Sequence, residues 1–219
     1  MKQLFTKTDK HIIPALPRFT FPGRIIVIQG KAEAERAVRA LEKQPLLGID
    51  TETRPTFRKG AMHKVALLQV STPHTCFLFR LNFIGFTPAL RRLMSSKETL
   101  KVGLSLRDDF HMLRLRNEFT PGAYVDLQDM AKDMGIEDMS LQKLFANVFR
   151  QRISKTAQLT NWEADVLSAS QKLYAATDAY ACIKLYEELK ALRESGNYHL
   201  LPPPPEPEAP AKRAETHNA

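Results

Sequence analysis

The chain has 219 residues, of which 43% are hydrophobic and 26% charged, so it carries enough apolar material for one core of ordinary size and cannot be disordered throughout. It holds 32 Lys and Arg residues against 24 Asp and Glu residues, a net charge of +8 that suits a polyanionic partner but also occurs in many soluble proteins. The longest stretch without a charged residue, Val65–Phe79, is interrupted by polar residues and a proline, which excludes a membrane-spanning segment.

The N-terminal half is predicted to begin with an extended segment and to continue with strands. Residues 1–22 contain three prolines around Phe19 and Phe21, which favours an extended strap lying on the core. Four apolar runs of strand length follow, at Arg24–Gln29, Leu46–Asp50, Lys64–Ser71 and Cys76–Leu81. Because only a T-P-H-T turn separates the last two, we expect these strands to form an antiparallel meander. Helical patterns occupy Ala32–Lys43 and Pro88–Met94.

The second half alternates strands and helices. Short strands are predicted at Thr99–Val102 and Ala123–Val125, on either side of an amphipathic helix over Leu106–Arg116. Further helices are expected within Leu127–Phe149 and, after an S-x-x-Q capping signature, over Lys172–Arg193. This order predicts an α/β fold with a mixed central sheet, an antiparallel meander followed by parallel strands, flanked by helices.

Residues 23–200 are predicted to form one domain, because nothing within them has the composition of a linker. Residues 201–219 are rich in proline and contain no aromatic side chain, so we expect a disordered tail. The N-terminus, MKQLFTKTDKH, lacks the apolar stretch of a secretory signal, and a cytoplasmic location is therefore expected.

Two carboxylates at the end of the second predicted strand are the first candidates for chemistry. Asp50 and Glu52, in G-I-D-T-E-T, stand two residues apart and therefore face the same side of an extended chain. The apolar run before them predicts a central strand, and the end of such a strand lies at a sheet edge where sites are built. By itself a D-x-E pair is weak evidence for a catalytic site, because strand ends that face solvent often carry acidic residues.

Later in the chain, Tyr174 and Asp178 are spaced to share one face of the last helix. The alternative is that Asp178 simply faces solvent. In K-V-G-L-S-L-R-D-D-F, Asp108 is explained by the helix dipole alone if Ser105 is the N-cap. Asp109 adjoins the apolar face of the same helix, so it is the better candidate for an inward-pointing acid.

In their order along the chain, these motifs resemble those of the DEDDy 3′-to-5′ exonucleases, a family that includes ribonuclease D and the exonuclease domain of the Werner syndrome helicase. The stretch T-N-W-E…L-S-A-S-Q-K-L-Y-A-A-T-D-A-Y-A, residues 160–181, is similar to the family's third motif. The resemblance extends over Arg24–Arg193 and implies a ribonuclease H-like fold. It also implies that the four family acids are Asp50, Glu52, Asp109 and Asp178 and that the signature tyrosine is Tyr174.

The resemblance implies metal-dependent catalysis by these five residues. Phosphodiester hydrolysis needs a nucleophile from water and relief of charge on the leaving oxygen, which two divalent cations about 4 Å apart supply. Carboxylates are hard ligands that suit Mg²⁺ or Mn²⁺. By resemblance, Asp50 bridges both ions, Glu52 and Asp178 complete the first site, and Asp109 supports the second through water. Tyr174 would orient the attacking water, because a pKa of about 10 makes tyrosine a poor base.

Two basic segments are candidates for contacts with substrate phosphates. They are Arg54, Arg58 and Lys59 directly after the D-x-E pair, and Lys143, Arg150, Arg152 and Lys155 in a segment without acids. The first group is equally explained as an ordinary basic loop that keeps the protein soluble.

The sequence therefore predicts a metal-dependent 3′-to-5′ exonuclease that releases nucleoside 5′-monophosphates from single-stranded or recessed 3′ ends. The alternative is a catalytically silent nucleic-acid-binding module, but such a relic is expected to have lost a site residue and all five are present. The sequence shows no counterpart of the helical or motor domains found in members of this family. We therefore expect a stand-alone exonuclease domain, for which a protein partner can supply additional affinity for nucleic acid. DNA and RNA both stay open as substrates, because that choice depends on the groove near the 2′-hydroxyl.

Overall fold

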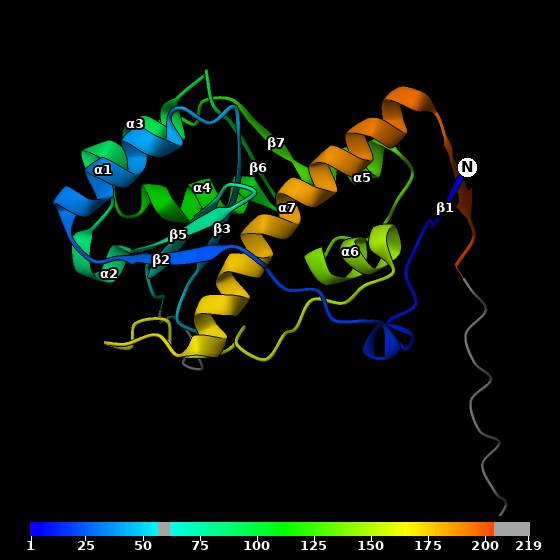
Figure 1. Ribbon diagram of the computed structural model, residues 1–219, viewed down its shortest axis with the longest axis horizontal. Coiled ribbons are helices and arrows are strands. Elements are labelled where there is room, and N and C mark those ends of the chain that lie inside the picture. The colour runs from blue at the N-terminus through cyan, green and yellow to red at the C-terminus, as the bar shows by residue number, and fades with distance from the viewer. Residues whose placement is uncertain (57–61, 204–219) are drawn as a thin grey trace, which may run out of the picture.

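The computed structural model describes residues 1–56 and 62–203, which form a six-stranded mixed sheet between two layers of helices (Figure 1). In spatial order the strands are β2 (Arg24–Ile28), β5 (Thr75–Arg80), β4 (Leu67–Ser71), β3 (Leu46–Glu52), β6 (Leu100–Gly103) and β7 (Tyr124–Asp126). The α/β architecture and the mixed central sheet predicted from the sequence are thus confirmed.

The strand directions correct one expectation. Strands β3, β4 and β5 form an antiparallel meander, and β6 and β7 continue the sheet in parallel with β3. The first strand of the sheet, β2, is not part of this meander, because it pairs in parallel with β5 at the sheet edge. The physical reason is helix α1 (Lys31–Leu41), which follows β2: a helix carries the chain across the sheet to a parallel strand, whereas a meander needs short turns.

Helices cover both faces of the sheet. One face packs against α1, α3 (Pro88–Ser95) and α4 (Leu106–Arg114), with α2 (Leu81–Ile84) at the end of β5. The buried residues of α1 are Ala34, Ala37, Val38 and Leu41, the spacing of a single helical stripe. The other face packs against α5 (Leu127–Asp133), α6 (Leu141–Phe149) and α7 (Ala169–Ser195), and Figure 1 shows α7 running diagonally across the strands.

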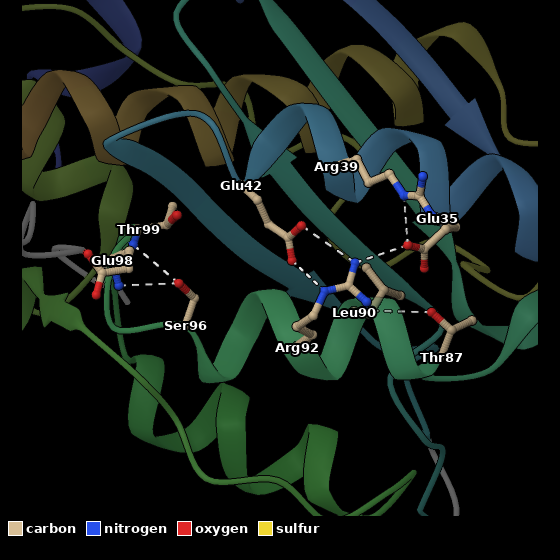
Figure 2. A network of polar contacts seen from close by, with 9 residues as sticks. All are labelled: Glu35, Arg39, Glu42, Thr87, Leu90, Arg92, Ser96, Glu98 and Thr99. Atoms are coloured by element: carbon tan, nitrogen blue, oxygen red, sulfur yellow. Dashed lines mark hydrogen bonds and ion pairs between the residues drawn. The ribbon is translucent and has the colours of Figure 1, made fainter.

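Polar contacts at the surface join α1 to α3 (Figure 2). The guanidinium of Arg92 on α3 contacts Glu35 at 3.1 Å and Glu42 at 2.6 Å, and the Thr87 hydroxyl caps α3 by accepting a hydrogen bond from the N–H of Leu90. About half of the Arg92 side chain is exposed, and ion pairs this accessible add at most about 1 kcal/mol to stability. Apolar packing therefore holds the two helices together.

Helix α7 approaches the centre of the sheet closely because β3 carries a glycine there. A Cβ atom at Gly48 would lie 2.0 Å from the carbonyl oxygen of Ala179, closer than any side chain can stand. Ser168 and Gln171 form the capping box that begins α7, as their spacing predicts. This close contact between α7 and β3 brings the residue before Ala179, Asp178, to the end of β3.

The N-terminal segment lies across α6 and α7. Its strand β1 (Lys2–Phe5) pairs in parallel with β8 (Tyr198–Leu201), so both ends of the described chain lie side by side (Figure 1). A short 3-10 helix (Ile13–Ala15) follows, and Phe19 packs against Tyr180 of α7. The predicted tail lies outside the described residues from residue 204 onward. No helix among the residues that the structure describes is both long and apolar enough to cross a lipid bilayer.

Candidate active site

Strand β3 ends with the two acids of the D-x-E pair on the side that faces α7. Asp50 is half-buried and Glu52 is 8% exposed, and the alternation of the strand sends the intervening Thr51 toward α4. The two carboxylates therefore project together from one strand end, as the sequence predicts.

Helix α7 brings the third acid and the tyrosine to the same place. One carboxylate oxygen of each of Asp50, Glu52 and Asp178 lies within 4.8 Å of the others. Asp178 is 3% exposed, and its Oδ1 atom is buried without a hydrogen-bond partner among the described residues. Tyr174, one turn earlier and also buried, forms a side-chain hydrogen bond with Asp178. Asp178 therefore faces the other acids rather than solvent.

The two adjacent acids of α4 face different ways. The carboxylate of Asp109 accepts a hydrogen bond of 2.7 Å from the Thr51 hydroxyl, which places it beside the three clustered acids but outside their 4.8 Å group. Asp108 is exposed and accepts a hydrogen bond from the hydroxyl of Ser105, the N-cap residue, at 2.8 Å. Ser105 has a left-handed backbone with φ of 64°, and its N–H donates to the carboxylate of Asp126. This turn starts α4 directly after β6 and points Asp109 inward.

Burial raises the pKa values of all four carboxyls, and the charges of neighbouring acids raise those of Asp50, Glu52 and Asp109 further. The pKa of Asp50 rises to about 8, mainly through burial and then through the charge of Asp178. Burial followed by the charge of Asp50 raises the pKa of Glu52 to about 10. The pKa of Asp178 rises to about 7 through burial, although its hydrogen bond with Tyr174 acts in the opposite direction. Burial, and then the charge of Asp50, raises the pKa of Asp109 well above its usual range.

Tyr174 stays protonated in this environment, since burial and the neighbouring acids raise the pKa of its hydroxyl far above the ordinary value. It can donate a hydrogen bond but cannot act as a base near neutral pH. The same reasoning applies to the acids as a group: without cations they retain protons, and bound cations would favour their ionised forms.

The acids open into a cavity of about 330 Å³. Its lining includes Asp50, Glu52, Tyr174 and Asp178, together with the start of α6 at residues 140–142. Ser105 and Gln158 also line the cavity. This volume lies at the small end of the range of ligand pockets, about 300–1,000 Å³.

The predicted phosphate contacts after the D-x-E pair are only partly described. The Arg54 guanidinium pairs with Glu163 at 3.3 Å, and His63 contacts the same carboxylate at 3.2 Å. Arg58 and Lys59 lie outside the described residues. Within the described part of the chain, Arg54 is therefore held by an acid of the loop that precedes α7.

The second basic segment divides into two kinds of residue. Arg150 donates a hydrogen bond to the carbonyl of Gln3, and Arg152 donates one to the carbonyl of Leu16, so both side chains hold the N-terminal segment. The side chains of Lys143 and Lys155 form no hydrogen bond or ion pair with any residue that the structure describes, and Lys155 is exposed. Only these two lysines of the segment are therefore free to meet a ligand.

Three contributors to the site were not anticipated from the sequence. Thr51 contacts Asp109, Glu163 holds Arg54, and Gln142 lines the same cavity as the acids. The start of α6 at Ser140 could have been predicted from the sequence, because serine is a favoured N-cap residue. That this helix start lines the same cavity as the acids of β3 depends on tertiary packing, so the local sequence could not predict it.

A family model described as 3′-5′ exonuclease matches residues 25–193, about three quarters of the chain. The chain belongs to the 3′-5′ exonuclease family. This membership makes it a hydrolase of phosphodiester bonds, and all four acids and the tyrosine lie within the matched residues.

Two curated relatives of this exonuclease illustrate the range of its family. The chain is 28% identical over 196 residues to the bifunctional 3′-5′ exonuclease/ATP-dependent helicase WRN of Mus musculus, a match that covers 85% of the chain and 14% of the relative. It is 30% identical over 195 residues to a 3′-5′ exonuclease of Arabidopsis thaliana, with 82% of the chain and 68% of the relative covered. The chain thus spans about two thirds of one relative and a small part of the other.

Solved structures show the fold of this exonuclease to be ribonuclease H-like. The exonuclease domain of Aedes aegypti Nibbler superposes with a TM-score of 0.74 at 19% identity, covering 82% of this chain and 94% of that one. Escherichia coli RNase D superposes with a TM-score of 0.69 at 20% identity, covering 78% and 46%. These likenesses concern the architecture alone, and the chain covers less than half of the RNase D chain.

Proposed function

We propose that this exonuclease uses two divalent cations, Mg²⁺ or Mn²⁺, to remove nucleoside 5′-monophosphates from the 3′ ends of DNA or RNA. The observation that carries the proposal is the convergence of Asp50, Glu52 and Asp178, whose carboxylate oxygens lie within 4.8 Å of one another. Membership of the 3′-5′ exonuclease family supports the direction of attack.

The donor set fits hard divalent cations. Three carboxylates supply only oxygen, the ligand that Mg²⁺ and Mn²⁺ prefer, and Asp178 Oδ1 is a buried oxygen with no partner in the described chain. A buried, unpaired acceptor costs about 1–3 kcal/mol, so a ligand at this atom is expected. When bound, two cations supply a nucleophile from water at neutral pH and neutralise charge on the leaving oxygen.

The protein residues divide the remaining work. Asp50, Glu52 and Asp178 would hold the cations, and Asp109, which accepts a hydrogen bond from Thr51, would support a second cation. Tyr174, which stays protonated, orients the attacking water from its place beside Asp178. The three clustered acids and Tyr174 line one cavity, so a strand end bound there would lie against all four of these side chains.

The substrate is proposed to be a single-stranded or recessed 3′ end, with phosphate contacts from Lys143 and Lys155 and from the loop of Arg54, Arg58 and Lys59. RNA belongs among the substrates to test, because a solved structure of Trypanosoma brucei RNase D, which shares this fold, is a complex with RNA U12. Few basic side chains surround the cavity itself, which supports the proposal that a protein partner strengthens the grip on nucleic acid.

The test is to incubate the purified chain with 5′-labelled DNA and RNA oligonucleotides, single-stranded and recessed, in Mn²⁺, Mg²⁺ or EDTA. We expect products that shorten stepwise from the 3′ end in the presence of cations, with nucleoside 5′-monophosphates identified by mass spectrometry. If every oligonucleotide stays intact while the protein binds it in a salt-sensitive manner, the chain is a silent binding module and the proposal is wrong.

A further inference from the structure

The N-terminal turn of α6 forms part of the wall of the cavity that also contains the acids. Ser140 is the N-cap, and its hydroxyl accepts a hydrogen bond of 3.4 Å from the N–H of Lys143. Its carbonyl accepts the N–H of Leu144. The N–H groups of Leu141 and Gln142 have no partner among the described residues, and both residues line the cavity. Two N–H groups without a partner among the described residues therefore stand at the positive end of a helix dipole, in residues that line the cavity.

The side chain of Gln142 adds a third donor at the same place. Gln142 is 6% exposed, yet its amide forms no hydrogen bond with any residue that the structure describes, and it borders the cavity. Its amide atoms are not among the fully buried polar atoms, so the amide reaches the space of the cavity although the rest of the residue is buried. The amide is therefore placed to bind something that enters the cavity.

The charge of this wall selects an anion rather than a cation. The first turn of α6 contains no acid, whereas three acids cluster elsewhere in the lining of the same cavity. No Lys or Arg occurs among the described residues that line the cavity. A lysine facing the acids would pair with them and compete with divalent cations, but neutral donors can hold a phosphate without this competition.

We propose that the α6 N-terminus and the Gln142 amide form a binding subsite for a phosphate of the substrate strand adjacent to the phosphate that is cleaved. The inference rests on the proposed nuclease function and names a contact of the same site. The acids and their cations hold the scissile phosphate, and α6 holds the neighbouring phosphate. The 3′ end of the nucleic acid is thereby held both by the acid cluster and by the neutral hydrogen-bond donors of α6.

The test combines two substitutions with substrates that lack one phosphate charge. Binding of a short labelled oligonucleotide is measured by fluorescence anisotropy in EDTA and in Ca²⁺. Gln142→Leu is expected to raise the Kd at least about 10-fold, the loss of one hydrogen bond to a charged group, and Gln142→Glu to raise it further through repulsion. Gln44→Leu is the matched control, because Gln44 precedes β3 at the end opposite the acids. Thermal melting should match the wild type for both Gln142 variants, since the amide bonds to nothing in the described chain.

Oligonucleotides with a single neutral methylphosphonate linkage locate the phosphate. We expect a methylphosphonate one linkage upstream of the scissile bond to weaken binding by the wild type and to have no further effect on Gln142→Leu. If Gln142→Leu binds like the wild type and shows the same methylphosphonate profile, the subsite is wrong even though the enzyme still cleaves. Tighter binding of Mn²⁺ by Gln142→Glu, without weaker oligonucleotide binding, would show a cation position and also overturn it. A wild type that neither binds nor cleaves any oligonucleotide overturns the proposed function as well.

Discussion

The Thr51 hydroxyl donates a hydrogen bond of 2.7 Å to the carboxylate of Asp109. Thr51 lies between the two acids of β3, so this bond ties α4 to the strand that carries Asp50 and Glu52. Burial raises the pKa of Asp109, and the Thr51 hydrogen bond opposes that shift by favouring the ionised form. One neutral side chain thus holds the fourth acid in place and opposes the rise of its pKa.

Replacing Thr51 with valine is expected to loosen Asp109 and to raise its pKa further. The removal of one partly buried hydrogen bond should lower the free energy of unfolding by about 1 kcal/mol. It should also raise the Mn²⁺ concentration needed for half-maximal cleavage, because a protonated Asp109 is a poor ligand. Urea unfolding and a Mn²⁺ titration measure the two effects. Thr51→Ser keeps the hydroxyl and should resemble the wild type; an equal defect in Thr51→Ser would show that the hydrogen bond is not the cause.

The raised pKa values of Asp50 and Asp178, about 8 and about 7, predict how metal-free stability depends on pH. In the unfolded chain these carboxyls titrate near pH 4, so above that pH the folded state binds more protons than the unfolded state. The free energy of unfolding therefore falls as the pH rises from about 4 through 8. We expect the melting temperature in EDTA to be lower at pH 8 than at pH 5.

Asp178→Asn removes one of these charges and should melt at least about 4 °C above the wild type at pH 8 in EDTA, with a smaller difference at pH 5. Added Mn²⁺ should stabilise the wild type more at pH 8 than at pH 5 and should have little effect on Asp178→Asn. Differential scanning calorimetry at the two pH values distinguishes these cases. A wild type that becomes more stable in EDTA as the pH rises would contradict the assignment of buried, mutually repelling acids.

Lys155 and Arg152 provide a matched pair for the contacts with nucleic acid. Lys155 is exposed and has no partner among the described residues, whereas the Arg152 guanidinium holds the Leu16 carbonyl at 3.0 Å. Lys155→Ala is expected to weaken binding of single strands and to lower the slope of log Kd against log salt by about 0.7, with no change in melting temperature. Arg152→Ala should leave the slope unchanged and destabilise the fold by about 1 kcal/mol. If Arg152→Ala lowers the salt slope and Lys155→Ala does not, the basic segment binds nucleic acid through Arg152 instead.

Gln69 lies directly opposite Asp50 on the neighbouring strand, fully buried, with neither side-chain amide atom hydrogen-bonded within the described chain. Two unpaired polar atoms in the core cost stability that a similarly shaped apolar side chain does not. Gln69→Met is therefore expected to raise the free energy of unfolding in EDTA by about 1–3 kcal/mol, as measured by urea denaturation. A clear loss of stability in this variant would show that the amide has a partner that this account does not contain.

The sequence predicted most of the site because the acids follow local rules. The alternation of a strand puts Asp50 and Glu52 on one side, and helical spacing stacks Tyr174 on Asp178. Gly48 also carried a signal, since a glycine inside a strand often marks a close backbone approach, and here it admits α7. These features depend on residues close together in sequence.

Other features depend on tertiary structure and had no local signal. The apolar pattern of Arg24–Gln29 predicted a strand but not its parallel partner β5, which is set by the crossover through α1. Asp109 was chosen over Asp108 from the apolar face of its helix, but the left-handed backbone of Ser105, whose N–H donates to Asp126 about twenty residues away, was not foreseen. The place of Gln142 in the lining of the cavity likewise follows from the packing of α6 and not from its own neighbours.

The most direct test of the central claim compares cleavage rates of wild type, Asp178→Asn and Asp108→Asn on one 5′-labelled single strand. Asp178 lies within the acid cluster, while Asp108 is an exposed neighbour of Asp109 that contacts only the Ser105 hydroxyl among the described residues. In Mn²⁺ we predict a 3′-to-5′ ladder from the wild type and from Asp108→Asn at similar rates, no ladder in EDTA, and a rate at least about 100-fold lower for Asp178→Asn. A ladder of undiminished rate from Asp178→Asn, or one that persists in EDTA, would contradict a cation-dependent acid cluster as the hydrolytic centre.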